Sequence, residues 1–352
     1  MCVRTGAGMR AVLIEEFGRT PVAAEVPDPE CPPTGAVVRV EATGVCRSDW
    51  HAWRGHDDSV RAPYVPGHEF AGVVERVGPD VGGFRPGDRV TAPFVFACGD
   101  CDACRAGDQQ VCARQEQPGF TVPGSFAERV TVLHADVNLV ALPDAVEFVD
   151  AAGLGCRFAT AYRAVRTRGA VMPGEWVAVH GCGGVGLSAV VIAVAAGARV
   201  VAVDVSAGAR EAAERLGAIA LAPSASVADD IRALTGGGAH LSLDAFGSAA
   251  TSIASVLSLR TRGRHVQVGL LLDADAAPPV PMGRVISAEL DILGSHGMSA
   301  RDYPAMLAEI ADGTLDPSMT RGRVIGFDEL PAALAGMDDP GRPPGMVVAV
   351  RD

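Results

Sequence analysis

The chain has 352 residues, of which 48% are hydrophobic, and this length suggests about two domains with a sizeable core. Its formal net charge of -12 argues against a nucleic-acid partner, which would need a basic surface. No apolar run approaches the roughly 18 to 20 residues of a membrane span, so we expect no membrane partner either. The start lacks the pattern of a secretory signal, and residues 1–8 resemble a loose extension.

The first part of the chain, from residue 9 to about 150, is expected to be rich in β-structure. Gly and Pro divide it into short valine-rich runs, and turn residues separate these runs. This pattern predicts strands at 37–45, 70–78, 88–96 and 126–133. Together they indicate a compact, barrel-like sheet.

From about residue 150 the pattern changes to helices that alternate with apolar strands. A helical stretch is predicted over 147–169. Strands are then predicted at 176–180, 199–204, 219–223, 241–247, 265–270 and 290–297, with helices at 186–198, 209–218, 226–236 and 252–263. Such alternation predicts βαβ units and a doubly wound parallel sheet, that is, an α/β fold. A helix at 301–313 and a strand at 346–350 follow.

A glycine-rich motif, HGCGGVG, follows the first of these apolar strands. Gly181, Gly183 and Gly186 form G-x-G-x-x-G at the head of a helix, where backbone N–H groups and the helix dipole suit a pyrophosphate. Asp204 ends the next strand, where a carboxylate can accept from a ribose 2′-hydroxyl and repel a 2′-phosphate. The motif therefore predicts dinucleotide binding with NAD favoured over NADP, the alternative being a tight turn without a ligand.

Four of the nine cysteines lie within fifteen residues, in CGDCDACRAGDQQVC. The spacing C-x2-C-x2-C-x7-C of Cys98, Cys101, Cys104 and Cys112 suits one tetrahedral Zn²⁺ with no position open for water, which is a structural site. An iron–sulfur cluster is the competing use of four thiolates. An odd cysteine number without an export signal favours a reducing cytoplasm over a disulfide framework.

A third group of residues is scattered along the chain. The stretch CRSDWH supplies Cys46, Ser48, Asp49 and His51, GHEF supplies His68 and Glu69, and GLGCRF supplies Cys156. Taken singly, each cysteine or histidine is more often an ordinary core or polar residue. Taken together, two Cys and one His leave the open fourth position that a catalytic zinc ion needs.

These motifs, in the order CRSD, GHEFAGVV, the four-cysteine segment, GCGGVG and the acidic residue after it, resemble the zinc-dependent alcohol dehydrogenases of the medium-chain dehydrogenase/reductase family. The resemblance covers residues 9–352. It implies a GroES-like catalytic domain over 1–156 and 295–352, with a structural zinc lobe at about 94–115. It further implies a Rossmann NAD-binding domain over 157–294 and a homodimer or homotetramer.

The resemblance also implies roles for individual residues. Cys46, His68 and Cys156 match the catalytic zinc ligands, with Glu69 beside the metal and Asp49 orienting the histidine. The proton relay matches Ser48 and His51, and the structural zinc matches Cys98, Cys101, Cys104 and Cys112. The cofactor-binding residues match Arg47, Thr160, Gly181, Gly183, Gly184, Val185, Gly186, Asp204 and Val268.

One segment departs from the family pattern. Many relatives carry an arginine in the final strand region for the pyrophosphate, whereas this chain reads PPGMVVAV. Phosphate binding is therefore expected to depend on Arg47 and the helix.

The expected activity is hydride transfer between a small alcohol and NAD, giving an aldehyde or ketone, with two zinc ions per chain. Trp50, Trp53, Phe94 and Leu270 are candidate pocket walls and favour an apolar or aromatic alcohol. Two alternatives stay open. One is an NAD(P)H-dependent carbonyl or iminium reductase, and the other is a non-catalytic zinc protein that binds NAD.

Overall fold

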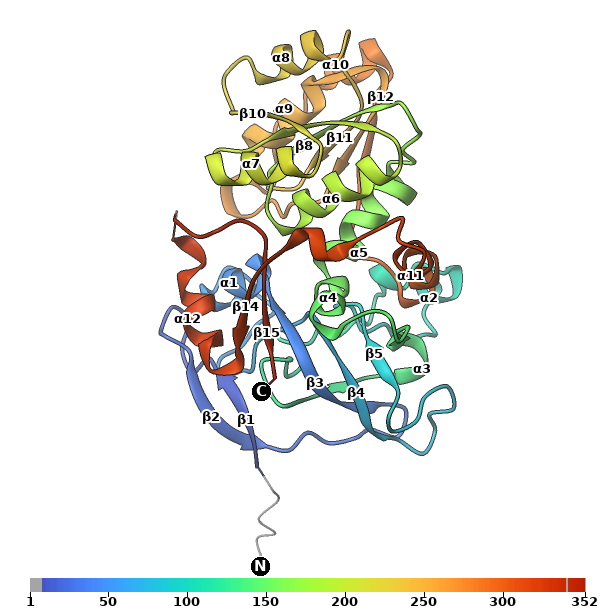
Figure 1. Cartoon of the computed structure of the whole chain (residues 1–352), viewed down its shortest axis with the longest axis vertical. Coiled ribbons are helices and arrows are strands. Elements are labelled where there is room, and N and C mark those ends of the chain that lie inside the picture. The colour runs from blue at the N-terminus through green and yellow to red at the C-terminus, as the bar shows by residue number, and fades with distance from the viewer. Residues whose placement is uncertain (1–7, 340, 352) are drawn as a thin grey trace, which may run out of the picture.

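A computed structural model describes residues 8–339 and 341–351. The extension expected at residues 1–8 therefore lies outside the described residues, except for Gly8, which opens the first strand. Figure 1 shows two lobes stacked along the long axis of the molecule. A β-rich lobe holds the N-terminal strands together with the C-terminal segment, and a sheet flanked by helices forms the other lobe.

The β-rich lobe is built on a seven-stranded sheet. Its order is β14 (Arg321–Gly326), β15 (Met346–Val350), β3 (Ala36–Val45), β4 (Phe70–Val77), β5 (Arg89–Thr91) and β7 (Val140–Ala141), with β6 (Arg129–Val132) also paired to β3. All pairs are antiparallel except β14 with β15. A separate hairpin joins β1 (Gly8–Leu13) and β2 (Val22–Pro27). The strands predicted in this region are confirmed, although β5 ends early because Pro93 lacks a backbone N–H and Phe94 N bonds the Gly155 carbonyl instead.

The other lobe is a parallel sheet of six strands. Its order is β10 (Ile219–Leu221), β9 (Arg199–Val203), β8 (Trp176–His180), β11 (Ala239–Asp244), β12 (Leu259–Gln267) and β13 (Asp291–Gly294). The helices that connect them are α6 (Gly184–Ala195), α7 (Ala207–Arg215), α8 (Val227–Leu234), α9 (Ala249–Leu257) and α10 (Met282–Ala288). Strand order reverses between β8 and β11, which is the switch point where doubly wound sheets bind ligands. The predicted α/β fold, GroES-like plus Rossmann, is confirmed, whereas the exact domain boundaries stay predictions.

The helix predicted over 252–263 is wrong in its second half. The helix α9 ends at Leu257, and β12 begins at Leu259, which pairs with Ala239 of β11. The sequence SLRTRG suits a helix locally, but pairing with β11 gives its backbone groups partners inside the sheet. Tertiary pairing therefore outweighs local propensity here.

The helical stretch predicted over 147–169 is broken into short pieces. They are α4 (Phe148–Ala151), a 3₁₀ turn over Ala152–Gly155, α5 (Arg157–Tyr162) and a π-helical turn over Arg163–Arg168. Cys156 interrupts the run with φ -134° and ψ -76°, which are not helical angles. The break carries the chain from the β-rich lobe into the parallel-sheet lobe and leaves Cys156 at their junction.

The C-terminal segment ties the two lobes together. The helix α11 (Tyr303–Ala311) follows the last strand of the parallel sheet, and the buried Tyr303 hydroxyl donates to the carbonyl of Leu154, 2.8 Å away. After α12 (Leu330–Ala335) the chain returns to the β-rich lobe as β15.

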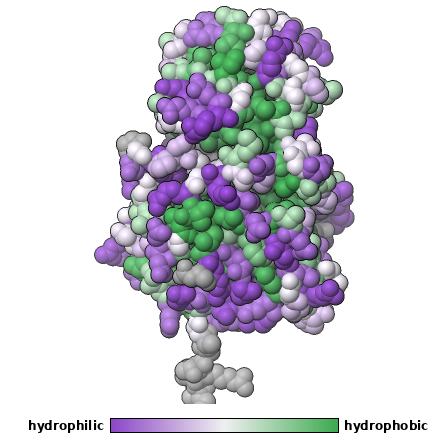
Figure 2. All heavy atoms as spheres, in the orientation of Figure 1, coloured by the Kyte–Doolittle hydropathy of each residue, from purple (hydrophilic) through white to green (hydrophobic). Residues whose placement is uncertain are grey.

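Hydrophilic residues cover much of the face drawn in Figure 2, with apolar patches on both lobes. Among residues 8–339 and 341–351, no helix is both long and apolar enough to cross a membrane.

Candidate active site and metal centres

The four clustered cysteines converge on one point in the lobe around α2 (Asp102–Ala106). Sulfur–sulfur distances are 3.5 Å for Cys101–Cys104 and Cys112–Cys98, 3.7 Å for Cys101–Cys112 and 3.9 Å for Cys98–Cys104. Four thiolates about 2.3 Å from one tetrahedral zinc ion would stand roughly 3.8 Å apart. A disulfide would need about 2.05 Å, and a multi-iron cluster would need room among the sulfurs for several irons. The spacing therefore fits a single zinc ion.

The electrostatics of this cluster also favour a cation. The backbone N–H of Cys104 donates to Cys101 and lowers its pKa to about 6, whereas burial raises the pKa of Cys104 to about 12. The guanidinium of Arg114 lies 3.2 Å from the sulfur of Cys98. Cys101 therefore ionises readily, whereas Cys104 does not. A divalent cation at the centre would stabilise all four side chains as thiolates.

The second candidate metal site joins residues from distant parts of the sequence. Cys46 follows β3 and precedes α1 (Arg47–Trp53), His68 and Glu69 precede β4, and Cys156 precedes α5. One ligand atom from each of these four residues lies within 4.8 Å of the others, and the cluster is buried. The thiol of Cys156 donates to Cys46 and holds the pKa of Cys46 well below its usual value, against the effect of burial. The geometry brings together the residues predicted to hold the catalytic zinc.

A buried carboxylate fixes the orientation of His68. Its Nδ1 lies 2.9 Å from Oδ1 of Asp49, which also accepts from the backbone N–H of Gly67, while Oδ2 accepts from the N–H of Cys46. Burial alone would lower the pKa of His68, but Asp49 and Cys46 outweigh it and raise that pKa well above its usual value. Nε2 is buried and has no hydrogen-bond partner among the described residues. This orphaned nitrogen is the donor that a metal ion would use.

Glu69 lies in the same group, but an arginine engages both of its carboxylate oxygens. Oε1 accepts from the backbone N–H and from Nε of Arg157, at 2.8 and 2.9 Å, and Oε2 pairs with Nη2. Burial raises the pKa of Glu69, and Arg157 opposes that shift. A Cβ at Gly44 would stand 2.3 Å from Oε2, so the ion pair needs a glycine there. The sequence motifs contained no signal for Arg157, which follows the candidate ligand Cys156.

Both predicted relay residues lie on α1, beyond Cys46. The Ser48 Oγ and Cys46 Sγ atoms are 3.8 Å apart, so the hydroxyl borders the candidate metal site. His51 is half-buried, and its Nδ1 lies 3.1 Å from Nδ1 of His56. Burial, followed by the positive charges of His56 and Arg47, lowers the pKa of His51.

The predicted phosphate loop lies at the switch point of the parallel sheet. Gly181 has φ 92°, in the left-handed region that favours glycine, and a Cβ on Gly186 would stand 1.8 Å from the Gly181 carbonyl oxygen. The helix α6 begins at Gly184 with Gly183 before it, and a Cβ on Gly183 would meet nothing within 4 Å. The first N–H groups of the helix, at Gly184 and Val185, have no partner within the helix, and the space beside Gly183 is open, which fits a pyrophosphate.

Three other predicted cofactor residues surround this loop. Asp204 follows β9, and its two carboxylate oxygens accept from the backbone N–H groups of Cys182 and Ser206 at 2.7 and 2.8 Å. These bonds fix the carboxylate beside the glycine loop. Val268 follows β12 and donates its N–H to the Asp244 carbonyl. Thr160 lies on α5, and its buried hydroxyl has no partner among the described residues, so it is free to bind a ligand.

Two neighbouring arginines, Arg47 and Arg342, share one carboxylate partner among the described residues. Arg47 pairs with Asp338 at 2.9 Å and also donates to the carbonyl of Met337. Arg342 forms no ion pair with a described residue, and burial followed by the charge of Arg47 lowers its pKa. Because the two guanidinium groups repel each other, an anion bound between them would be stabilised. Sequence reasoning searched for an arginine inside the last strand and missed Arg342, which comes four residues before it.

Aromatic rings lie beside His68 of the candidate catalytic metal site. Phe94 and Phe120 meet the ring of His68 edge-on, with centroids 6.2 and 5.3 Å away, and Phe94 also meets His296. The expectation that Trp53 lines a substrate pocket is wrong, because Trp53 is packed in the core of the β-rich lobe and its indole N–H donates to the carbonyl of Arg19.

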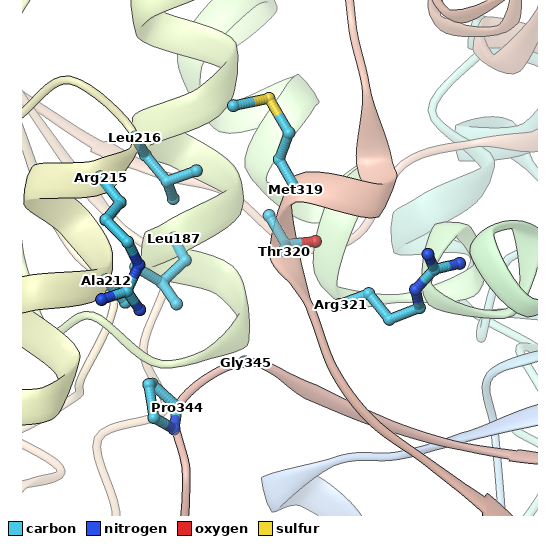
Figure 3. A pocket seen from close by; sticks show the side chains of 9 residues that line it. All are labelled: Leu187, Ala212, Arg215, Leu216, Met319, Thr320, Arg321, Pro344 and Gly345. Carbon is cyan, nitrogen blue, oxygen red and sulfur yellow. The ribbon is translucent and has the colours of Figure 1, made fainter.

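A separate cavity of about 260 Å³ lies between the parallel-sheet lobe and the C-terminal segment (Figure 3). None of the predicted site residues lines it. Its walls come from α6 and α7 on one side and from the segments around β14 and before β15 on the other, namely Leu187, Ala212, Arg215, Leu216, Met319, Thr320, Arg321, Pro344 and Gly345.

Comparison with known proteins agrees with this architecture. Residues 32–144 match the family described as alcohol dehydrogenase GroES-like domain, and residues 184–312 match zinc-binding dehydrogenase. The chain is 36% identical over 310 residues to an alcohol dehydrogenase of Geobacillus stearothermophilus, with 87% of this chain and 90% of the relative covered. It is 32% identical over 326 residues to an NAD-dependent alcohol dehydrogenase of Sulfurisphaera tokodaii, with 89% and 92% covered.

Among solved structures, alcohol dehydrogenase TADH from Thermus sp. ATN1 superposes with a TM-score of 0.90 at 33% identity, covering 98% of this chain and 100% of that one. The chain belongs to the zinc-type alcohol dehydrogenases of the medium-chain dehydrogenase/reductase family, which makes it an oxidoreductase. The resemblance predicted from the motifs is confirmed.

Proposed function

We propose that this protein oxidises small alcohols to aldehydes or ketones with NAD, using one catalytic and one structural zinc ion per chain. The observation that carries the proposal is the buried group of Cys46, His68 and Cys156, in which Nε2 of His68 has no hydrogen-bond partner among the described residues and Asp49 holds the ring in place. Two thiolates and one imidazole leave a fourth position for substrate, as catalytic zinc requires.

A zinc ion at this site would act as a Lewis acid and make an alcohol hydroxyl more acidic. Ser48, beside Cys46, is placed to take the hydroxyl proton, and His51 passes it outward. The low pKa of His51 keeps its ring neutral, and so able to accept a proton, near neutral pH. Phe94 and Phe120 beside His68 exclude water and favour an apolar or aromatic alcohol.

The chain's cofactor-binding groups suit NAD. The N-terminus of α6, Arg47 and Arg342 offer positive charge to a pyrophosphate, and Asp204 offers a carboxylate to a ribose hydroxyl. The unpaired Thr160 hydroxyl offers a hydrogen bond near the nicotinamide. Exposed apolar side chains of Met282, Ile286 and Ile292 around α10 and β13 support assembly as a dimer or tetramer through this lobe.

The test is a steady-state screen with purified, zinc-loaded protein. Primary, secondary, aromatic and polyol alcohols are each offered with NAD and with NADP, and the matching carbonyl compounds with NADH and NADPH. We expect NAD-linked oxidation of apolar or aromatic alcohols, and its loss in Cys46→Ser with NAD binding retained. Activity confined to NADPH-linked carbonyl reduction would favour the reductase alternative. NAD binding without turnover of any substrate would favour a non-catalytic role.

A further inference from the structure

The helix α1 and the turn after it bring two histidine rings into contact. The Nδ1 atoms of His51 and His56 lie 3.1 Å apart, and the ring centroids are 5.4 Å apart. The backbone N–H of His56 bonds the His51 carbonyl at 3.0 Å, and Gly55 between them has φ 75°, which a glycine adopts without strain. The short distance between the rings is therefore built into the turn.

The two rings differ in exposure. His51 is half-buried at the edge of the candidate active site, whereas His56 is exposed. The indole of Trp50 meets both rings edge-on, with centroids 5.0 and 5.6 Å away. Arg47 and Arg54 stack on that same indole, at 4.9 and 5.7 Å from its centroid. The pair thus forms a fixed path from the interior to the surface.

We propose that His56 is the outer member of a two-histidine relay that carries the alcohol proton from His51 to solvent. This inference rests on the proposed dehydrogenase function. The hydrogen bond between the two Nδ1 atoms requires one ring to donate and the other to accept. In the proposed relay, Nε2 of His51 takes up the proton and Nε2 of the exposed His56 releases it to water.

The proton balance of the relay is simple. A proton that reaches Nε2 of His51 makes that ring a cation, and its Nδ1 proton moves to Nδ1 of His56. His56 then releases its Nε2 proton to water or a buffer base. One proton enters and one leaves, and no electron moves. The rings recover their starting tautomers by exchange with water between turnovers.

The surroundings of His51 favour release of a proton from its ring. Besides His56, the groups that act on it are Arg47, which lowers its pKa, and Cys46 and Asp338, which raise it. Burial is the largest effect and also lowers this pKa. His51 therefore gives up a proton more readily than an ordinary histidine. The two rings are not a metal site among the described residues, because no third ligand joins them in a cluster.

The first test needs no cofactor or substrate. Histidine ring signals of the zinc-loaded protein are titrated by NMR, in wild type, in His56→Asn and in the control His134→Asn. His134 is exposed and has φ 47°, a conformation that asparagine tolerates. In His56→Asn the pKa of His51 should rise toward its ordinary value of 6.5, since a neighbouring positive charge is lost. The control should leave His51 unchanged.

The second test follows alcohol oxidation against pH. His56→Asn should slow turnover about fivefold on the low-pH side, less than the loss of a direct general base because water can substitute. Added imidazole should restore most of the rate. In a His51→Gln background, His56→Asn should not slow alcohol oxidation further, because no proton reaches His56 when His51 is absent.

The two tests have results that would overturn the proposed relay. An unchanged titration of His51, or a changed titration with an unaltered pH–rate profile, would overturn the relay. An additive loss in the double variant would also overturn it. If wild-type protein oxidises no alcohol, the proposed function fails and the relay fails with it, and that result is visible before any His56 variant is made.

Discussion

At the scale of single residues, Asp204 is the side chain that we expect to decide between NAD and NADP. Asn in its place keeps an oxygen for only one of the N–H groups of Cys182 and Ser206 and loses the charge, and Val205 beside it is 80% exposed. The double variant Asp204→Asn, Val205→Arg should raise the NADP to NAD ratio of kcat/KM at least about tenfold, equal to about 1.4 kcal/mol. Val205→Arg alone is the control. Wild-type protein that already uses NADP equally well would refute this role.

The burial of His180 leads us to predict how the free energy of unfolding depends on pH. It ends β8, is 1% exposed, and its Nε2 has no partner among the described residues. Burial and the neighbouring His265 lower its pKa to about 3, from 6.5. Above pH 6.5 the ring is neutral in both the folded and the unfolded state. Below it only the unfolded state takes up the proton, so the free energy of unfolding falls by about 1.4 kcal/mol per pH unit until about pH 3.

The measurement is urea unfolding at pH 7 and pH 5 for wild type, His180→Leu and the control His134→Asn. Wild type and control should lose about 2 kcal/mol more than His180→Leu over this interval. Equal losses in all three proteins would show that His180 is protonated in the folded state.

Some site residues could be predicted from the sequence, and others could not because their roles depend on contacts with distant residues. Cys46, His68, Asp204 and the glycines stand in recognisable motifs, because metal ligation and phosphate binding demand fixed residue types at fixed spacing. Arg157 stands next to Cys156 in the stretch GLGCRF, but that stretch gives no signal for what the arginine does. Its role depends on Glu69, 88 positions away, lying against it, and only the folded chain shows that pairing.

At the scale of elements, the cysteine lobe is expected to depend on its metal. The buried Cys104 and its three partners join α2 to the loops around it, and few other apolar side chains pack there. Cys104→Ser should remove one zinc ion per chain and lower the unfolding midpoint by about 5 °C or more. Cys31→Ser, which changes a cysteine outside both clusters, is the control. The measurement is calorimetry with metal analysis on the same samples.

Cys46→Ser should behave in the opposite way, abolishing turnover while leaving the unfolding midpoint close to that of wild type. If Cys104→Ser stayed stable but inactive and Cys46→Ser unfolded early, the two metal roles would be exchanged.

Helices and strands were predicted best where the pattern of apolar residues along the sequence matches the burial of the element in the fold. The apolar strands β8, β9 and β11 are recognisable because they are buried on both faces. The residues of β12 after Leu259 include three exposed positions, and their pairing with β11 leaves no periodic signal in the sequence. The short helix α1, which positions the relay residues, is also invisible to periodicity because it spans only two turns.

At the scale of the whole molecule, two complete ligand sets predict two zinc ions per chain. Elemental analysis should return about two for wild type and about one for each of Cys46→Ser and Cys104→Ser. A value of one in wild-type protein purified without chelator would remove one of the two sites from the proposal.

The position of β15 has a consequence for how the protein is made. This strand, the last one in the chain, lies inside the seven-stranded sheet between β14 and β3, and Val347 pairs with Val45, next to Cys46. All six strands of the parallel sheet are synthesised by residue 294, so that lobe can fold while translation continues. The seven-stranded sheet lacks β15 until residues 346–350 have been synthesised. If Cys46, His68 and Cys156 hold zinc as proposed, metal capture is a late event, because Cys46 directly follows the part of β3 that pairs with β15. A chain stopped before residue 346 would keep most of its length but lack the strand beside that site.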